Sequence, residues 1–258
     1  MANHARADIE TALRARKLDR TLTTALPREH RDEAALVAMD VPALDACLRG
    51  GLPRGQLSEI AGPSSSGRTT LAVQAIAAST RRGEIAALVD TFDRLDVASA
   101  AAAGVDLDRL LWIRGQSWGP ASDFALRATS DRSAGPDGAI NRALKALNLV
   151  LQARGFACVV LDLADAPPAA LKRIPFTTWL RVQRVIEGSD TACLLVAPQP
   201  LARSAGGLTL LLAGRARWAG DADRNRHLAG ADVTVRVVSP RRRVDGEVSV
   251  RATANDSR

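Results

Sequence analysis

Short apolar runs alternate with segments of helical periodicity over most of the chain from Leu36 onward. The apolar runs cover residues 57–61, 85–90, 110–113, 157–162 and 192–197. Helical spacing of apolar residues covers 69–79, 97–103, 139–154 and 174–187. Near-continuous apolar strands are typical of a sheet that is buried on both faces. The pattern therefore predicts an α/β fold, in which a mostly parallel sheet carries helices on both faces.

The pattern changes near both ends of the chain. Residues 208–212, 233–238 and 248–251 form apolar runs without clear helices between them, which indicates antiparallel strands that close the sheet. Residues 5–26 have the spacing of a short basic helix, and 115–137 are rich in Gly, Ser, Asp and Pro, as in a long loop. We expect a basic arm with its linker at 1–35, a core domain at 36–252 and a disordered tail at 253–258.

The composition is that of an ordinary soluble protein, with 47% hydrophobic and 24% charged residues. No apolar run approaches the ~18 residues of a membrane span, and the first residues lack the apolar stretch of a secretory signal. Cys47, Cys158 and Cys193 are far apart in apolar surroundings, which favours reduced core residues over a disulfide framework. We therefore expect a cytoplasmic protein without membrane contact.

The net charge of +7 comes mostly from arginine. A basic surplus favours contact with nucleic acid or with an acidic protein, although a GC-rich genome would produce the same bias. With four Trp, four Phe and no Tyr, no stacking platform for single-stranded bases is obvious. The three histidines are isolated, so none has a second ligand at metal-site spacing.

One segment carries a chemical motif. Residues 62–69 match the phosphate-loop pattern G-x-x-x-x-G-K-[ST] at every fixed position except the lysine, and an apolar strand precedes them while a helix follows. Glycines let such a loop wrap around phosphate, and amides at the start of the helix face the anion. The predicted nucleotide-binding residues here are Gly62, Pro63, Ser64, Ser65, Ser66, Gly67, Arg68, Thr69 and Thr70.

Arg68 stands where the pattern requires lysine. Lysine is a compact point charge that reaches the β- and γ-phosphates, whereas the guanidinium group is larger and planar. Arginine can neutralise phosphate but in another geometry, and phosphoryl transfer depends on positioning. We therefore expect binding of ATP and Mg²⁺ to be more readily kept than hydrolysis, with Thr69 as a magnesium ligand.

The residues around the loop resemble the RecA recombinase family. The stretch from Leu44 to Gly55, LDACLRGGLPRG, leads through Glu59 and Ile60 to the phosphate loop, as in that family. Residues 104–111, GVDLDRLL, resemble the family's G-V-D-x-D-x-L-L segment. The match is specific over roughly 36–113 and looser to about 200. It implies a RecA-like phosphate-loop NTPase fold.

The resemblance also implies roles for single residues. Asp162, at the end of the run VVLD, matches the Walker B aspartate and would hold magnesium, while Asp96 falls near the adenine. Gln199 falls on the glutamine that senses the γ-phosphate. The family's catalytic glutamate lands on Phe92, which cannot orient or deprotonate water. Asp93 and Asp165 are the conceivable substitutes.

The segments that match the family's DNA-binding loops are short. About ten residues separate Asp162 from the helix near Ile174, and only 200–207 follow Gln199 before the next apolar run. Arg203, and Lys172 with Arg173, are candidates for phosphate contacts. The chain's size and its combined losses resemble the ImuA-type accessory proteins of bacterial translesion mutagenesis.

This resemblance predicts a DNA-repair accessory protein of the SOS and translesion-synthesis response. It would bind RecA or translesion polymerase accessory proteins and have a degenerate, weak or absent ATPase. One alternative is an active DNA-dependent ATPase that binds single-stranded DNA, with Asp93 or Asp165 as the base. Another is a DNA-binding module that uses its arginines without nucleotide.

Overall fold

The computed structural model describes residues 36–115, 135–202, 206–221, 226–238 and 246–253. The chain divides into two units, residues 1–32 and 33–258. The predicted basic helix at 5–26 and most of the predicted loop at 115–137 lie outside the described residues.

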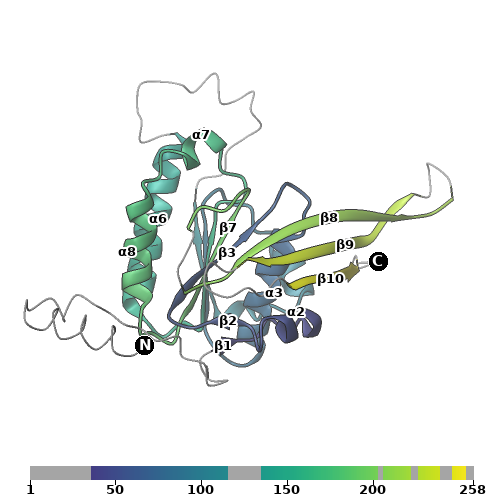
Figure 1. Ribbon diagram of the computed structural model, residues 1–258, viewed down its shortest axis with the longest axis horizontal. Helices are drawn as coiled ribbons and strands as arrows, with labels where there is room; N and C mark the ends of the chain where they lie inside the picture. Colours follow the sequence, from purple (N-terminus) through teal and green to yellow (C-terminus); the bar gives the residue numbers. More distant parts are fainter. Residues whose placement is uncertain (1–35, 116–134, 203–205, 222–225, 239–245, 254–258) are drawn as a thin grey trace, which may run out of the picture. The chain divides into compact units, whose positions relative to one another are not determined.

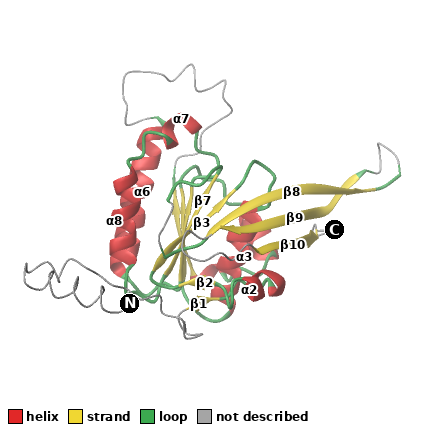
Figure 2. Ribbon diagram, in the orientation of Figure 1, coloured by secondary structure: helices red, strands yellow, loops and turns green. Residues whose placement is uncertain are grey.

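An eight-stranded sheet forms the centre of the second unit (Figures 1 and 2). Its strands follow in the order β10-β9-β8-β3-β7-β6-β4-β5. From β8 to β5 every neighbouring pair is parallel, and β8-β9 and β9-β10 are antiparallel. The strands are β3 (Gln56–Ala61), β4 (Ala86–Asp90), β5 (Leu110–Arg114), β6 (Cys158–Asp162), β7 (Ala192–Ala197), β8 (Thr209–Ala219), β9 (His227–Val238) and β10 (Gly246–Thr253). The predicted mostly parallel α/β fold with antiparallel C-terminal strands is confirmed.

Helices cover the two faces of the sheet and divide the core into two clusters. On one face, α3 (Arg68–Arg81) packs with α2 (Pro42–Cys47) and α4 (Val97–Ala102). On the other face α6 (Pro136–Ala153) and α8 (Phe176–Ile186) lie side by side (Figure 1). Alternate side chains of each strand point to opposite faces, so β3, β4, β6 and β7 contribute to both clusters. These four strands are mostly apolar because both of their faces are buried.

Several elements differ from the sequence expectations. A small antiparallel pair, β1 (Leu36–Val37) and β2 (Leu52–Pro53), precedes the main sheet in the chain and was not predicted. The short stretch after β6, expected to be a loop, contains a helical turn, α7 (Pro168–Leu171), and proline suits its first position. Strands β8 and β9 are also about twice as long as their apolar runs suggest. No described helix has both the length and the apolar character needed to span a bilayer.

Candidate nucleotide site

The phosphate loop joins the carboxyl end of β3 to the amino end of α3, the arrangement predicted from the motif. Gly67 ends the loop with a left-handed backbone, φ +87°, which glycine adopts without strain. The loop also packs against the C-terminal strands. A Cβ on Gly67 would lie 2.8 Å from the Val233 side chain, and one on Gly214 would lie 2.5 Å from the Ser65 carbonyl oxygen. Strands β8 and β9 therefore support the loop from one side.

The residues of the loop form a buried set and an exposed set. The buried residues are Gly62, Ser66 and Arg68, and the exposed ones are Pro63, Ser64, Ser65, Thr69 and Thr70. The Ser66 hydroxyl is buried without a hydrogen-bond partner among the described residues. A Cβ on Gly62 would lie 2.6 Å from that hydroxyl, so the oxygen lies against the start of the loop.

Arg68 is folded into the protein and is only 6% exposed. Its Nη1 donates to the Gly62 carbonyl oxygen, and its Nη2 donates to the Ala164 carbonyl oxygen at 2.8 Å. The same Nη2 lies 4.0 Å from a carboxylate oxygen of Asp165. The guanidinium group thus ties the beginning of the phosphate loop to the segment after β6, a task that one ammonium group performs less well.

Asp162 and Thr69, the residues predicted to bind magnesium, border one small cavity. Both line a space of about 20 Å³ that Arg94 also borders. Burial raises the pKa of Asp162 from 3.8 to about 6, with Asp90 and Asp165 adding to the rise, while the Ala164 amide and the Arg68 charge oppose it. A cation would favour the ionised carboxylate. An oxygen pair of this kind suits Mg²⁺.

Asp162→Asn should make the stability of the protein less sensitive to pH. The native pKa lies above the unfolded one, so wild-type stability falls as pH rises from about 4 to about 6 and the loss is complete above that range. We expect the variant to exceed wild type by about 2 kcal/mol at pH 8, roughly 4–8 °C in melting temperature, with a smaller gap at pH 4.5 that closes below pH 3.8. Thermal melts of both proteins at the two pH values, with Asp165→Asn as the matched control, measure this. An equal gap at both pH values would contradict the assignment.

No carboxylate replaces the missing glutamate in the expected place. Phe92 is 5% exposed and belongs to the core beneath α6. Both carboxylate oxygens of Asp93 accept from Arg114, at 2.8 and 2.9 Å, and this contact holds the pKa of Asp93 below its ordinary value. Asp165 does lie beside the phosphate loop, yet Arg94 Nε contacts one of its oxygens at 3.2 Å. Of the two substitutes, the structure brings only Asp165 to the loop.

The other two predicted contacts have different surroundings. Asp96 caps the amino end of α4, where its carboxylate accepts from the Ala98 and Ser99 amides at 3.3 Å. The Ser99 hydroxyl also donates to it and is the main reason why the pKa of Asp96 is lowered. Gln199 follows β7 by two residues and its side chain is exposed. The capping role of Asp96 is complete without nucleotide.

Two buried carboxylates that sequence reasoning did not single out organise this edge of the sheet. Glu59, on β3, accepts from the Leu201 and Ala202 amides at 2.8 and 2.9 Å and from the Thr209 hydroxyl at 2.8 Å. Asp90, at the end of β4, accepts from the Arg94 and Leu95 amides and from Trp112 Nε1. A lone acidic residue within an otherwise apolar strand was the available signal, because such a charge is buried only with partners.

Comparison with known proteins agrees with the geometry of this edge. The family of the RecA N-terminal domain matches residues 16–124, which begin well before the segment that first suggested the resemblance. Protein RecA of Nostoc punctiforme is 56% identical over 68 residues, 26% of this chain and 19% of the relative. Protein RecA of Clavibacter michiganensis is 43% identical over 106 residues, 40% of this chain and 29% of the relative.

The phosphate-loop segment is RecA-like. The chain nevertheless spans less than a third of the length of these curated relatives in the matched region. A mostly parallel α/β sheet with antiparallel C-terminal strands is consistent with a RecA-like fold.

Proposed function

We propose that this chain is a RecA-like DNA-repair accessory protein of the SOS and translesion-synthesis response. It acts in the cytoplasm through protein partners, RecA or mutasome components, and its ATPase is degenerate. The observation that carries the proposal is the position of Arg68. Its guanidinium group is committed to two backbone carbonyl oxygens at the phosphate loop, so its charge is used to hold the fold.

The residues around the loop support nucleotide binding more than turnover. When ATP and Mg²⁺ bind, the backbone of 62–70 would hold the phosphates, and Thr69 with Asp162 would hold the metal, which screens phosphate charge. Thr69 and Asp162 border the same cavity and would supply an oxygen ligand each. Hydrolysis also needs a group that orients water, and Phe92 is a buried core residue. This combination favours a protein that binds nucleotide weakly and does not cycle.

The segments that match DNA-binding loops support a role through partners. After β6, the turn α7 packs Ala170 and Leu171 into the core, which leaves little chain to surround a DNA strand. Lys172 and Arg173 are exposed beside it, and Arg173 pairs with Asp137 of α6. After β7, Glu59 holds the chain at Leu201 and Ala202. Short, anchored segments suit a surface that a protein partner recognises.

The proposal is tested by measuring ATP turnover of the purified protein with and without single-stranded DNA, beside a RecA protein as positive control. We expect no turnover above that of Asp162→Ala, in which the metal ligand is absent. Binding is then measured by anisotropy, with labelled protein titrated against RecA filaments on single-stranded DNA and, separately, against the bare DNA. We expect saturable binding to the filament and weaker binding to bare DNA.

Two outcomes would replace this proposal with its alternatives. Turnover that single-stranded DNA stimulates and that Asp162→Ala abolishes identifies an active DNA-dependent ATPase, with Asp165 as the first candidate base. Equal affinity for bare DNA and filament, with a steep dependence on salt, identifies a DNA-binding module. If the protein is an active ATPase, Arg68 either breaks its hydrogen bonds to the two carbonyl oxygens during turnover or contributes to catalysis without moving.

A further inference from the structure

Strand β10 forms one edge of the eight-stranded sheet. It extends over eight residues, Gly246–Thr253, and every one of them pairs with β9. Among the described residues no strand pairs with its other side. A regular edge strand presents a row of backbone donors and acceptors to any further strand, and soluble proteins usually cover or interrupt such edges. The register of β9 and β10 is continuous over all eight pairs, so this edge is regular.

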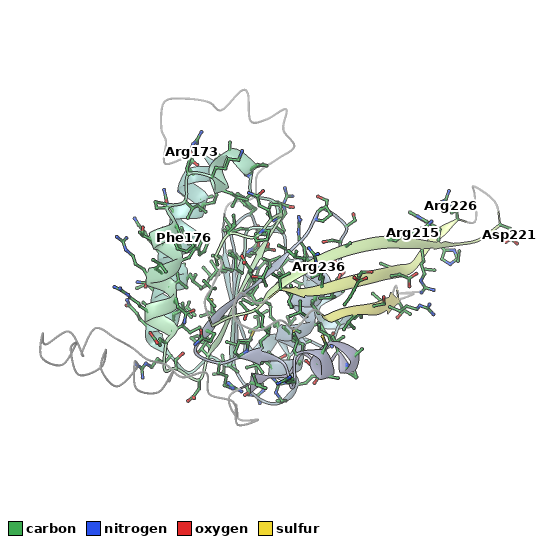
Figure 3. The ribbon with its side chains drawn as sticks, viewed as in Figure 1. Arg173, Phe176, Arg215, Asp221, Arg226 and Arg236 are labelled. Atoms are coloured by element: carbon green, nitrogen blue, oxygen red, sulfur yellow. The ribbon has the colours of Figure 1, made fainter. Side chains whose placement is uncertain are left out.

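The two faces of β10 continue the patterns of the sheet. On one face Val248, Val250 and Ala252 are partly buried opposite Val235, Val233 and Ala231 of β9. On the other face Glu247 lies opposite Arg236, and Arg251 lies opposite Asp232, which it contacts at 3.2 Å. Strand β8 extends this second row, since Arg215 lies opposite Asp232 (Figure 3 labels Arg215 and Arg236). Charges thus alternate in sign across three strands.

We propose that β10 pairs with β10 of a second copy of this chain, antiparallel and centred on Ser249, to give a symmetric dimer with one continuous sheet. A two-fold axis perpendicular to the sheet places residues at equal distances from the centre opposite one another and keeps each face on its own side. With Ser249 at the centre, Glu247 lies opposite Arg251 of the second copy, and Arg251 lies opposite its Glu247. Val248 and Val250 pair in the same way on the apolar face.

The other symmetric registers are less favourable. A centre at Glu247 or at Arg251 places like charges directly opposite each other, which destabilises a strand pair. A centre at Val248 leaves Glu247 opposite Ser249, and a centre at Val250 leaves Glu247 opposite Thr253 and Arg251 opposite Ser249. Only the register centred on Ser249 satisfies both charges twice, and it prolongs the alternating row. That row then runs Arg215, Asp232 and Arg251, followed by Glu247 and Arg236 of the second copy.

This self-complementarity favours a second copy over an unrelated strand. To match β10, a partner strand needs a basic residue opposite Glu247 and an acidic residue opposite Arg251. An unrelated strand would carry this pair of charges only by coincidence. The copy supplies them by symmetry. On the apolar face, where α2 already packs against β10, Val248 and Val250 of one copy would meet Val250 and Val248 of the other along the strand edge. A single pair of edge strands buries less than the roughly 1,200 Å² of a standard interface, so we expect a dimer in the micromolar range.

The test is sedimentation of the full chain over a concentration series, on the order of 1–200 μM to bracket that affinity. We expect wild type to shift from monomer to dimer with rising concentration. Glu247→Arg and Arg251→Glu should each weaken self-association by about tenfold or more, because each opposes like charges twice.

Mixing the two variants tests the pairing of the charges directly. An equimolar mixture should recover dimerisation, because the two facing positions are then both arginine in one chain and both glutamate in the other. Opposite charges then face each other at both pairs of positions, 247 with 251 and 251 with 247, as they do in the wild-type dimer. Wild type that stays monomeric throughout, or a mixture that associates no better than the single variants, overturns the proposal.

The register has an independent readout that does not alter charge. In a Cys47→Ser background, Ser249→Cys places two sulfurs opposite each other across the two-fold axis, within the Cα separation that a disulfide needs. Mild oxidation should convert this variant to a covalent dimer. Thr253→Cys is the matched control, since it lies at the far end of the strand and should stay monomeric. Cys158 and Cys193 are buried and do not compete.

Equal cross-linking of both variants, or of neither, would overturn the register. Melting curves of each variant verify that it is folded.

Discussion

Replacing Glu59 with alanine is expected to lower the free energy of unfolding by about 4 kcal/mol, or roughly 8–16 °C in melting temperature. The carboxylate is 2% exposed and accepts from two amides and one hydroxyl. Hydrogen bonds to a charged group contribute more than neutral ones, and the substitution leaves the Leu201 and Ala202 amides buried without that acceptor. The loss therefore combines three hydrogen bonds with the cost of unsatisfied donors.

The Glu59→Ala substitution should loosen the segment after β7 as well as lower the stability of the whole fold. Leu201 and Ala202 follow Gln199, so Glu59 holds the segment that would report on the nucleotide site. Hydrogen exchange should show lost protection of these two amides in Glu59→Ala, and thermal melts should show the drop in stability. Thr209→Val is the matched control because it removes one of the three donors and keeps the carboxylate, and we expect it to cost about 1 kcal/mol. A loss in Glu59→Ala no greater than in Thr209→Val would show that the amides find other acceptors.

The layout of the core could be predicted because its signal is local. Continuous apolar runs such as 192–197 have few alternatives to a strand buried on both faces, and the observed β7 coincides with that run. The outer half of the β8-β9 ribbon carries no such signal. It contains alanine, glycine and arginine and lies largely exposed, so pairing with the opposite strand determines its conformation.

The candidate site was predictable in its motif but not in the state of its side chains. The pattern places Arg68 at the start of α3, yet its orientation depends on the Ala164 carbonyl oxygen, 96 residues later in the chain. The role of Glu59 depends in the same way on amides 142 and 143 residues away. Asp93 and Asp165 were equivalent in the sequence. They differ because Arg114 on β5 reaches the first, whereas the second lies next to the phosphate loop.

The second large effect is expected from Arg68→Lys, which should bind Mg²⁺–nucleotide at least about tenfold more tightly than wild type. In wild type the guanidinium group donates to two carbonyl oxygens. It can turn toward a bound phosphate only if these two contacts break. An ammonium group cannot span the two carbonyls, so its charge is free to turn toward phosphate. The variant without ligand should be less stable by about 1–2 kcal/mol, since charge-assisted hydrogen bonds are lost.

Melting temperatures measured with and without Mg²⁺–ADP separate these two effects, because ligand stabilises only in proportion to its affinity for the native state. Arg68→Gln is the matched control: it also loses the contacts but carries no charge, so it should lose stability without tighter binding. Tighter binding by both variants would mean that removing the guanidinium group is sufficient, and no gain in either would mean that Arg68 does not limit access. Even with lysine at position 68 we expect no ATP turnover, because the buried Phe92 lies where the resemblance to RecA would place the catalytic glutamate. The phosphate-binding charge and the water-orienting group are therefore separate requirements, and recovering the first restores binding alone.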